Sequence, residues 1–321
     1  MKNAYIIVIL VAIILIVLVV LIKAVKTGGF GRTFGGGSTK AVSAAESDVP
    51  YASQSSSQVL NVYTPESVTN DVCPVIILVH GGGFAMETQN EGLIQPVIVK
   101  ALEKGYAVVS VDYRKSSEAV FPAALSDVKA AVRWVRVNAE KYRFNSDAIT
   151  IWGESAGAYL AVMTALTPDV SELDGDVTEN AGYSSAVDNV VSFYAPVEFY
   201  TMDQEFTALG LSKCANHNKA NSFESRFLGQ ELDEDRDKTY TTYWEVYKDQ
   251  LPSDFTLKAW IQAGSNDKNV PYTQSENLAD RLESIIGVEK IHFNLIEGAG
   301  HMDAAFYTDG NLDSVFAFLS D

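Results

Sequence analysis

Residues 148–157 read Ala-Ile-Thr-Ile-Trp-Gly-Glu-Ser-Ala-Gly and join two different secondary-structure patterns. Residues 148–152 are short, apolar and β-branched, which is typical of a buried strand. Residues 158–166 are small or helix-compatible, which predicts a helix. A Gly-x-Ser-x-Gly sequence between a strand and a helix is typical of the nucleophile elbow, a strained turn that exposes a serine hydroxyl and needs glycines where any Cβ would collide with backbone. The sequence therefore predicts that Ser155 is a nucleophile.

A serine hydroxyl is a poor nucleophile at neutral pH, so the elbow serine needs a base. The chain contains four histidines. His301 lies on a glycine-rich loop after the alternating strand pattern of residues 291–296, where an elbow serine's base is expected. His292 lies inside that pattern and is predicted to be a packed or half-exposed strand residue. His217 lies in a polar stretch and is predicted to be a solvated loop residue, which leaves His301 as the predicted base.

An acid must orient this base, and elbow enzymes carry it between the serine and the histidine along the chain. Residues 259–263 form a strand-like run that leads into a turn-rich loop with Asp267 at its centre. Glu297 and Asp303 fit less well because they are very close to His301 in the sequence. Asp267 is therefore the predicted acid; in the alternative interpretation it only stabilises an Asx-type turn.

Three consecutive glycines occur in the sequence His-Gly-Gly-Gly-Phe at residues 80–84, directly after an apolar strand candidate at residues 75–79. Glycines let backbone N–H groups approach a developing oxyanion with no side chain in the way. We expect the amides of Gly82, Gly83 and Ala156 to form a three-donor oxyanion hole, with His80 supporting the loop. A phosphate cradle would need a following Lys-Ser/Thr or a Gly-x-Gly-x-x-Gly spacing, and neither is present.

Together these elements resemble the α/β-hydrolase fold. More narrowly, they are similar to the carboxylesterases of the hormone-sensitive-lipase-like group and to bacterial feruloyl- and acetyl-esterase-like relatives. The resemblance covers the chain from about Val59 onwards, and the stretches that carry it are residues 80–84, 111–114, 127–142, 153–157, 267–271 and 300–301.

The resemblance implies a serine carboxylic-ester hydrolase that needs no cofactor and acts on small acyl, aryl or carbohydrate-linked esters. It implies Ser155 as nucleophile, Asp267 as acid and His301 as base. Two departures bear on substrate preference: Glu154 stands where the family often has Asp, and residues 142–145 read Tyr-Arg-Phe-Asn instead of Tyr-Gly-x-Asp. The alternatives are a serine peptidase of the same fold and a catalytically retired binding protein tethered to a membrane.

Strand and helix patterns alternate from residue 59 to the C-terminus, which predicts one α/β catalytic domain over residues 59–321 with a mostly parallel sheet flanked by helices. A helix is predicted over residues 127–142. Residues 199–251 are acidic and aromatic, interrupt the alternation and predict a cap insertion. Its aromatic side chains either line an acyl or aryl pocket or pack against one another. Strands are expected near residues 59–63, 75–80, 106–112, 148–152, 189–194, 259–263 and 291–296.

Residues 1–26 are predicted to form an N-terminal membrane anchor, with a transmembrane helix over about residues 4–22. A secretory signal would have a shorter apolar core and a small-residue cleavage site, but a cleaved signal is the alternative. Residues 27–58 are rich in Gly, Ser, Thr and Ala and are predicted to be a flexible linker. We expect a single-pass protein of the cell membrane with an extracytoplasmic catalytic domain; the lysines after the apolar segment favour the cytoplasmic face instead.

The net charge is −17 and the isoelectric point is about 4.6. Such an acidic chain repels nucleic acid, so we expect no nucleic-acid partner. The histidines and cysteines show no metal-ligand spacing, and no metal is expected. Cys73 and Cys214 are the only cysteines; the sequence leaves open whether they form a disulfide, and it does not indicate an oligomeric state.

Overall fold

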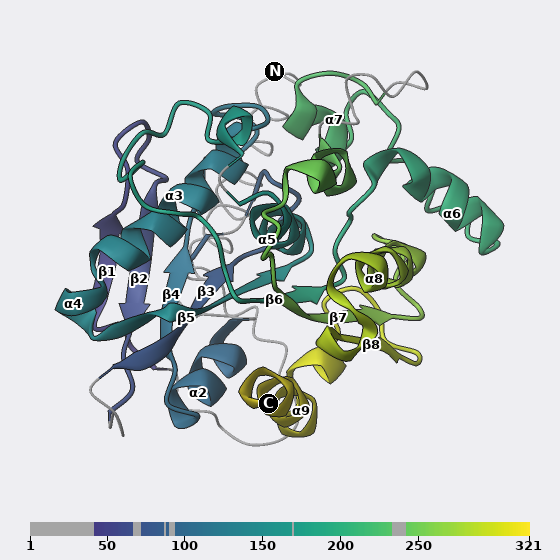
Figure 1. The fold of residues 1–321 in the computed structure, drawn as a ribbon. Helices are drawn as coiled ribbons and strands as arrows, with labels where there is room; N and C mark the ends of the chain where they lie inside the picture. The colour runs from purple at the N-terminus through teal and green to yellow at the C-terminus, as the bar shows by residue number, and fades with distance from the viewer. Residues whose placement is uncertain (1–41, 67–71, 87, 90–93, 169, 233–241) are drawn as a thin grey trace, which may run out of the picture. The chain divides into compact units, whose positions relative to one another are not determined.

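The computed structural model describes residues 42–66, 72–86, 88–89, 94–168, 170–232 and 242–321. These residues belong to one compact unit, residues 39–321, built on a sheet with the strand order β1-β2-β4-β3-β5-β6-β7-β8 (Figure 1). The β1–β2 and β2–β4 pairs are antiparallel and the other pairs are parallel. The strands are β1 (Glu46–Pro50), β2 (Val59–Tyr63), β3 (Cys73–Val79), β4 (Ala107–Val111), β5 (Phe144–Glu154), β6 (Asn189–Phe193), β7 (Lys258–Gly264) and β8 (Ile291–Ile296).

Helices cover both faces of this sheet, as Figure 1 shows. Val75 and Ile77 of β3 belong to the apolar cluster that includes α3, α5 and α8, while Ile76 and Leu78 belong to the cluster that includes α2 and α9. A strand that is buried on both faces is mostly apolar, which explains the continuous apolar run of β3. The α-helices are α2 (Gln95–Glu103), α3 (Ala123–Val137), α4 (Ala139–Tyr142), α5 (Ala156–Leu166), α6 (Met202–Ala208), α7 (Phe223–Leu228), α8 (Thr273–Ile286) and α9 (Asp309–Ser320). The 3₁₀ helices are η2 (Ser171–Leu173), η3 (Phe199–Thr201), η5 (Trp244–Gln250), η6 (Val288–Lys290) and η7 (Ala304–Tyr307).

The mostly parallel sheet flanked by helices is confirmed, and each of the predicted strands is present. Strand β5 begins at Phe144, ahead of the predicted start at residue 148. The helix predicted over residues 127–142 begins earlier, at Ala123, and is interrupted at Asn138 between α3 and α4. The Asn138 side-chain amide donates a hydrogen bond to the carbonyl oxygen of Trp134 at this break (2.9 Å).

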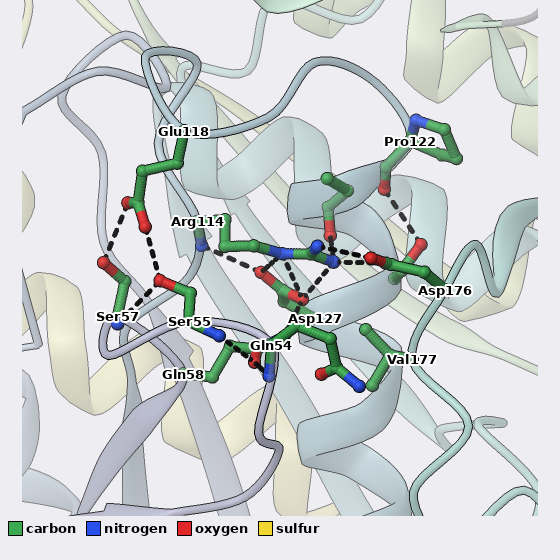
Figure 2. A network of polar contacts seen from close by, with 12 residues as sticks. Gln54, Ser55, Ser57, Gln58, Arg114, Glu118, Pro122, Asp127, Asp176 and Val177 are labelled. Atoms are coloured by element: carbon green, nitrogen blue, oxygen red, sulfur yellow. Dashed lines mark hydrogen bonds and ion pairs between the residues drawn. The ribbon is translucent and has the colours of Figure 1, made fainter.

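The predicted linker over residues 27–58 is wrong for residues 46–58. Residues 46–50 form β1, which pairs with β2 at the edge of the sheet. Figure 2 shows how the following polar stretch is held: Gln58 Nε2 donates to Asp127 Oδ1 (2.7 Å), and Asp127 also pairs with Arg114 (2.8 Å). Ser57 donates to Glu118 Oε1 (2.8 Å). These polar side chains therefore bind the folded domain instead of water, and the domain begins before residue 59.

Among the described residues, no helix combines the length and apolar character needed to cross a bilayer. The predicted transmembrane segment at residues 4–22 and the first part of the predicted linker lie outside the described residues. Cys73 and Cys214 are both free thiols, so the possible disulfide between them is not formed.

The predicted insertion over residues 199–251 lies between β6 and β7 and contains η3, α6, α7 and η5. We call this segment the cap. Most of its described aromatic side chains are buried. The Phe227 ring stacks on Phe84 with 4.0 Å between ring centroids, and Trp244 is buried. Phe223 differs, because this residue is 38% exposed and lines the same pocket as Ser155. The structure thus partly agrees with both interpretations, because most of the aromatic cap residues are packed away from solvent while Phe223 lines a pocket.

Candidate active site

Ser155 stands at the turn between β5 and α5, with the strained backbone angles φ 52° and ψ −122°. Two close backbone approaches make this turn possible. A Cβ on Gly153 would collide with the carbonyl oxygen of Gly157, and a Cβ on Gly157 would collide with the carbonyl oxygens of Val79 and His80. The flanking glycines are therefore required by packing, as the sequence predicted.

The predicted base, His301, lies within hydrogen-bonding distance of both Ser155 and the predicted acid, Asp267. His301 Nε2 is 3.0 Å from Ser155 Oγ, and His301 Nδ1 is 2.7 Å from Asp267 Oδ2. Asp267 is 3% exposed and its Oδ1 accepts hydrogen bonds from the amides of Asn269 (2.8 Å) and Val270 (3.0 Å). One carboxylate oxygen is thus fixed by backbone donors, which leaves the other aimed at the imidazole.

Two loops carry the acid and the histidine, and they follow the neighbouring parallel strands β7 and β8. They approach each other closely at Gly264, where a Cβ would collide with the Ala299 carbonyl oxygen. That oxygen accepts a hydrogen bond from the Asn266 amide (2.9 Å). The other two acids considered are engaged elsewhere: Glu297 accepts from the Ser265 hydroxyl, and Asp303 accepts from the Ala305 amide at the start of η7.

Gly82, Gly83 and Ala156 line the same pocket as Ser155. Within the described ranges, their amides donate no backbone hydrogen bond, so the pocket holds three N–H groups without an internal partner. The left-handed backbone at Gly83 (φ 59°) favours glycine, and a Cβ there would meet the Phe223 ring at 2.6 Å. The predicted donors are therefore brought together beside the serine.

His80 contacts the backbone of the glycine loop. Its buried ring stacks on Tyr113 with 4.4 Å between ring centroids, and Nδ1 lies 2.9 Å from the carbonyl oxygen of Gly81. Nε2 lies 3.0 Å from Asp112 Oδ1. Burial lowers the pKa of His80, although the hydrogen bond with Asp112 opposes this shift. His80 does not line the pocket, which fits the predicted supporting role.

The prediction for His217 is wrong. It is 7% exposed and links the cap to the loop that carries the acid. Its Nδ1 lies 2.9 Å from Asp203 Oδ1 in α6, and its Nε2 lies 2.9 Å from the carbonyl oxygen of Asn269. The backbone amide of His217 also donates to Asp203 Oδ1 (2.9 Å). The Phe206 ring stacks on its imidazole. The polar neighbours in the sequence gave no signal of this burial, because its partners lie in α6 and in the acid loop.

The pocket has a volume of about 520 Å³ and is bounded by the glycine loop, the elbow, the cap and the loops of Asp267 and His301. Within the described part of the chain, no group of three or more His, Cys, Asp or Glu side chains is placed to hold a metal ion. The pocket contains a serine hydroxyl, a hydrogen-bonded imidazole and a set of backbone N–H donors.

The fold and this serine–histidine–aspartate arrangement define the class of α/β-hydrolases with a nucleophile elbow. The family model BD-FAE matches residues 60–282, so the chain belongs to the BD-FAE family.

The sequence is also similar to those of curated esterases. The esterase LipQ of Mycobacterium tuberculosis is 34% identical over 154 residues, covering 48% of this chain and 35% of LipQ. The esterase LipC of the same organism is 24% identical over 250 residues, covering 76% of this chain and 56% of LipC. This chain therefore spans only about a third to a half of the length of these relatives.

Among solved structures, a truncated carbohydrate esterase from gut microbiota superposes with a TM-score of 0.75 at 27% identity. The superposition covers 89% of this chain and 98% of that one. The region that these comparisons share is thus that of an ester-bond hydrolase.

Proposed function

We propose that this protein is a serine carboxylic-ester hydrolase that uses Ser155, His301 and Asp267 as its triad. The observation that carries the proposal is the hydrogen-bonded line from Asp267 through His301 to the hydroxyl of Ser155. Similarity to the esterase LipQ and to the structure of a carbohydrate esterase supports ester hydrolysis over peptide hydrolysis and over a retired binding protein. A filled triad also argues against a retired site, because all three chemical roles have a competent residue.

In the proposed reaction, His301 Nε2 takes the proton of Ser155 Oγ as this oxygen attacks the ester carbonyl. The amides of Gly82, Gly83 and Ala156 stabilise the negative charge that forms on the carbonyl oxygen. His301 then gives the proton to the leaving alcohol, which departs and leaves an acyl group on the serine. Water, activated by the same imidazole, cleaves this acyl-enzyme and releases the carboxylic acid.

The substrates proposed are small acyl, aryl or carbohydrate-linked esters, and a substrate panel tests the activity. We expect the full-length protein to hydrolyse p-nitrophenyl esters, which can be compared from acetate to palmitate and alongside methyl ferulate. Cleavage of peptide p-nitroanilides without ester hydrolysis would favour the peptidase, and no hydrolysis of either class would favour the binding protein.

We also propose that residues 4–22 anchor the protein in the cell membrane, with the catalytic domain on the extracytoplasmic side. The uninterrupted apolar run of Ile, Val, Leu and Ala at residues 6–22 supports this proposal. Release after signal cleavage and a cytoplasmic orientation are the alternatives.

The full-length protein is expected to stay in the membrane fraction after a carbonate wash, because a spanning segment resists conditions that remove surface-bound proteins. Immunoblotting of the washed pellet and the supernatant measures this. A variant without residues 1–41 provides the control and is expected in the supernatant. Recovery of a shortened soluble form from full-length expression would show signal cleavage instead.

A further inference from the structure

The charge of the active-site pocket differs from that of the rest of the chain. The sequence has 41 acidic and 24 basic residues, so the chain as a whole has an excess of carboxylates. The pocket reverses this balance, because four basic residues and one acidic residue line it. The basic residues are Lys213, Lys219 and Arg226 of the cap and Lys268 of the acid loop, and the acidic residue is Glu224.

Three of these cations have no counter-ion within the described residues. Lys213, Lys219 and Lys268, which we call the lysine cluster, are exposed, and their ammonium groups make no ion pair or hydrogen bond with the rest of the described chain. Elsewhere, Lys100 and Lys129 each lie within 3.2 Å of a carboxylate oxygen. Some lysines of this acidic protein thus form ion pairs with carboxylates, whereas the lysine cluster does not. Its positive charge is therefore available to a ligand in the pocket.

The two remaining charged residues at the pocket are Arg226, which is also positive, and Glu224, which is the one acidic residue in the lining. Arg226 already has partners, since its guanidinium lies 4.8 Å from the centroid of the Phe223 ring and its Nε donates to the Ser222 carbonyl oxygen (3.3 Å). Glu224 is 7% exposed, and this burial raises the pKa of its carboxyl and disfavours the charged form. The net charge that the pocket presents to a ligand is therefore positive.

We propose that this pocket selects esters that carry an anionic group, a carboxylate or a sulfonate, close to the scissile bond. The inference rests on the proposed ester hydrolysis and names the substrate class of the same site. The lysine cluster contributes charge from two sides, because Lys213 and Lys219 belong to the cap and Lys268 follows the catalytic acid. An anionic substrate replaces the missing counter-ions, which a neutral ester cannot do.

Matched pairs of esters test the proposal on the full-length protein. For charge on the alcohol part, 4-acetoxybenzoate is compared with methyl 4-acetoxybenzoate, and 4-acetoxybenzenesulfonate tests sulfonate in place of carboxylate. For charge on the acyl part, mono-p-nitrophenyl adipate is compared with p-nitrophenyl hexanoate. Each anionic-to-neutral ratio of kcat/KM is divided by the ratio of the rates with a neutral nucleophile, imidazole, which corrects for differences in intrinsic reactivity without a charge effect of its own.

At low ionic strength, we expect the corrected ratio to favour the anionic ester by about tenfold in at least one arm, since each of several nearby charges contributes a few-fold. The ratio should approach one in 0.5 M salt, where screening shortens the reach of the lysine charges. The arm that shows the preference identifies the part of the substrate that carries the charge.

The variant K213Q/K219Q/K268Q removes the lysine cluster, and its corrected ratio is expected to fall to about one. A general loss of activity cancels in this ratio, because both esters are measured on the same variant. The matched control, K104Q/K141Q/K290Q, removes the same charge from lysines that do not line the pocket and should keep the preference.

A wild-type ratio near one in both arms, or an equal ratio in the cluster variant and the wild type, would overturn the anionic substrate while leaving ester hydrolysis intact. A preference lost equally in both triple variants would assign it to the overall charge of the protein and also overturn the proposal. Absence of hydrolysis of every ester by the wild type would overturn the proposed function itself, and the inference with it.

Discussion

Ser155→Ala is expected to lower kcat for ester hydrolysis by about 10⁴–10⁶-fold, because no acyl-enzyme can form without the serine oxygen. The fold should survive. The strained backbone at position 155 is no worse for alanine than for serine, and the neighbouring glycines that permit the turn are unchanged. Steady-state rates with p-nitrophenyl acetate measure the loss, and the thermal unfolding midpoint should stay within a few degrees of the wild type.

Ser284→Ala is the matched control, because this exposed hydroxyl only donates to the Arg281 carbonyl oxygen in α8. It should keep wild-type activity. More than a few per cent of activity in Ser155→Ala, after removal of wild-type contamination, would show that another group is the nucleophile.

Asp267→Asn is expected to cost about 10⁴-fold in kcat. The reason lies in the two oxygens of the carboxylate. Oδ1 accepts two backbone hydrogen bonds, so the asparagine oxygen must take that position and its NH₂ group must face His301 Nδ1. An NH₂ donor at Nδ1 holds the imidazole proton on Nε2, the nitrogen that has to accept the serine proton.

Asp303→Asn is the control for this loss, since Asp303 caps η7 and its substitution leaves the Asp267–His301 contact in place. Activity within a few-fold of the wild type is expected for this variant. A large loss in Asp303→Asn or Glu297→Gln, combined with an active Asp267→Asn, would place the acid on the histidine's own loop.

Most of the parallel part of the sheet could be predicted from the sequence because its inner strands are largely buried on both faces, whereas the half-buried edge strand β8 could be predicted from its alternating pattern. Burial on both faces produces continuous apolar runs, such as residues 75–79, that are easy to recognise. The positions of Ser155, Asp267 and His301 followed from the predicted strand ends, since each residue comes directly after or near the end of β5, β7 or β8. Parallel strands end at the same edge of the sheet, which brings the three loops together.

Strand β1 and the burial of His217 could not be predicted in this way. Residues 46–50 form a short edge strand with exposed positions and a proline, so they lack both an apolar run and a clear alternation. His217 is buried by contacts with Asp203 and with the Asn269 carbonyl oxygen, and the second of these lies 52 residues away in the sequence. A polar stretch can be buried when residues distant in the sequence satisfy its hydrogen bonds. The neighbouring residues in the sequence do not reveal these partners.

The contacts of His217 also limit how this enzyme can be redesigned. Exchanging the cap for that of a relative is a natural route to a new substrate range, because the cap forms one wall of the pocket. Here, such a graft would remove the His217 side chain, which contacts the Asn269 carbonyl oxygen, while the Asn269 amide donates to Asp267, the proposed catalytic acid. A transplanted cap that keeps Asp203 and His217 preserves the support of Asp267, whereas one that omits them changes the reactivity of the site together with its specificity.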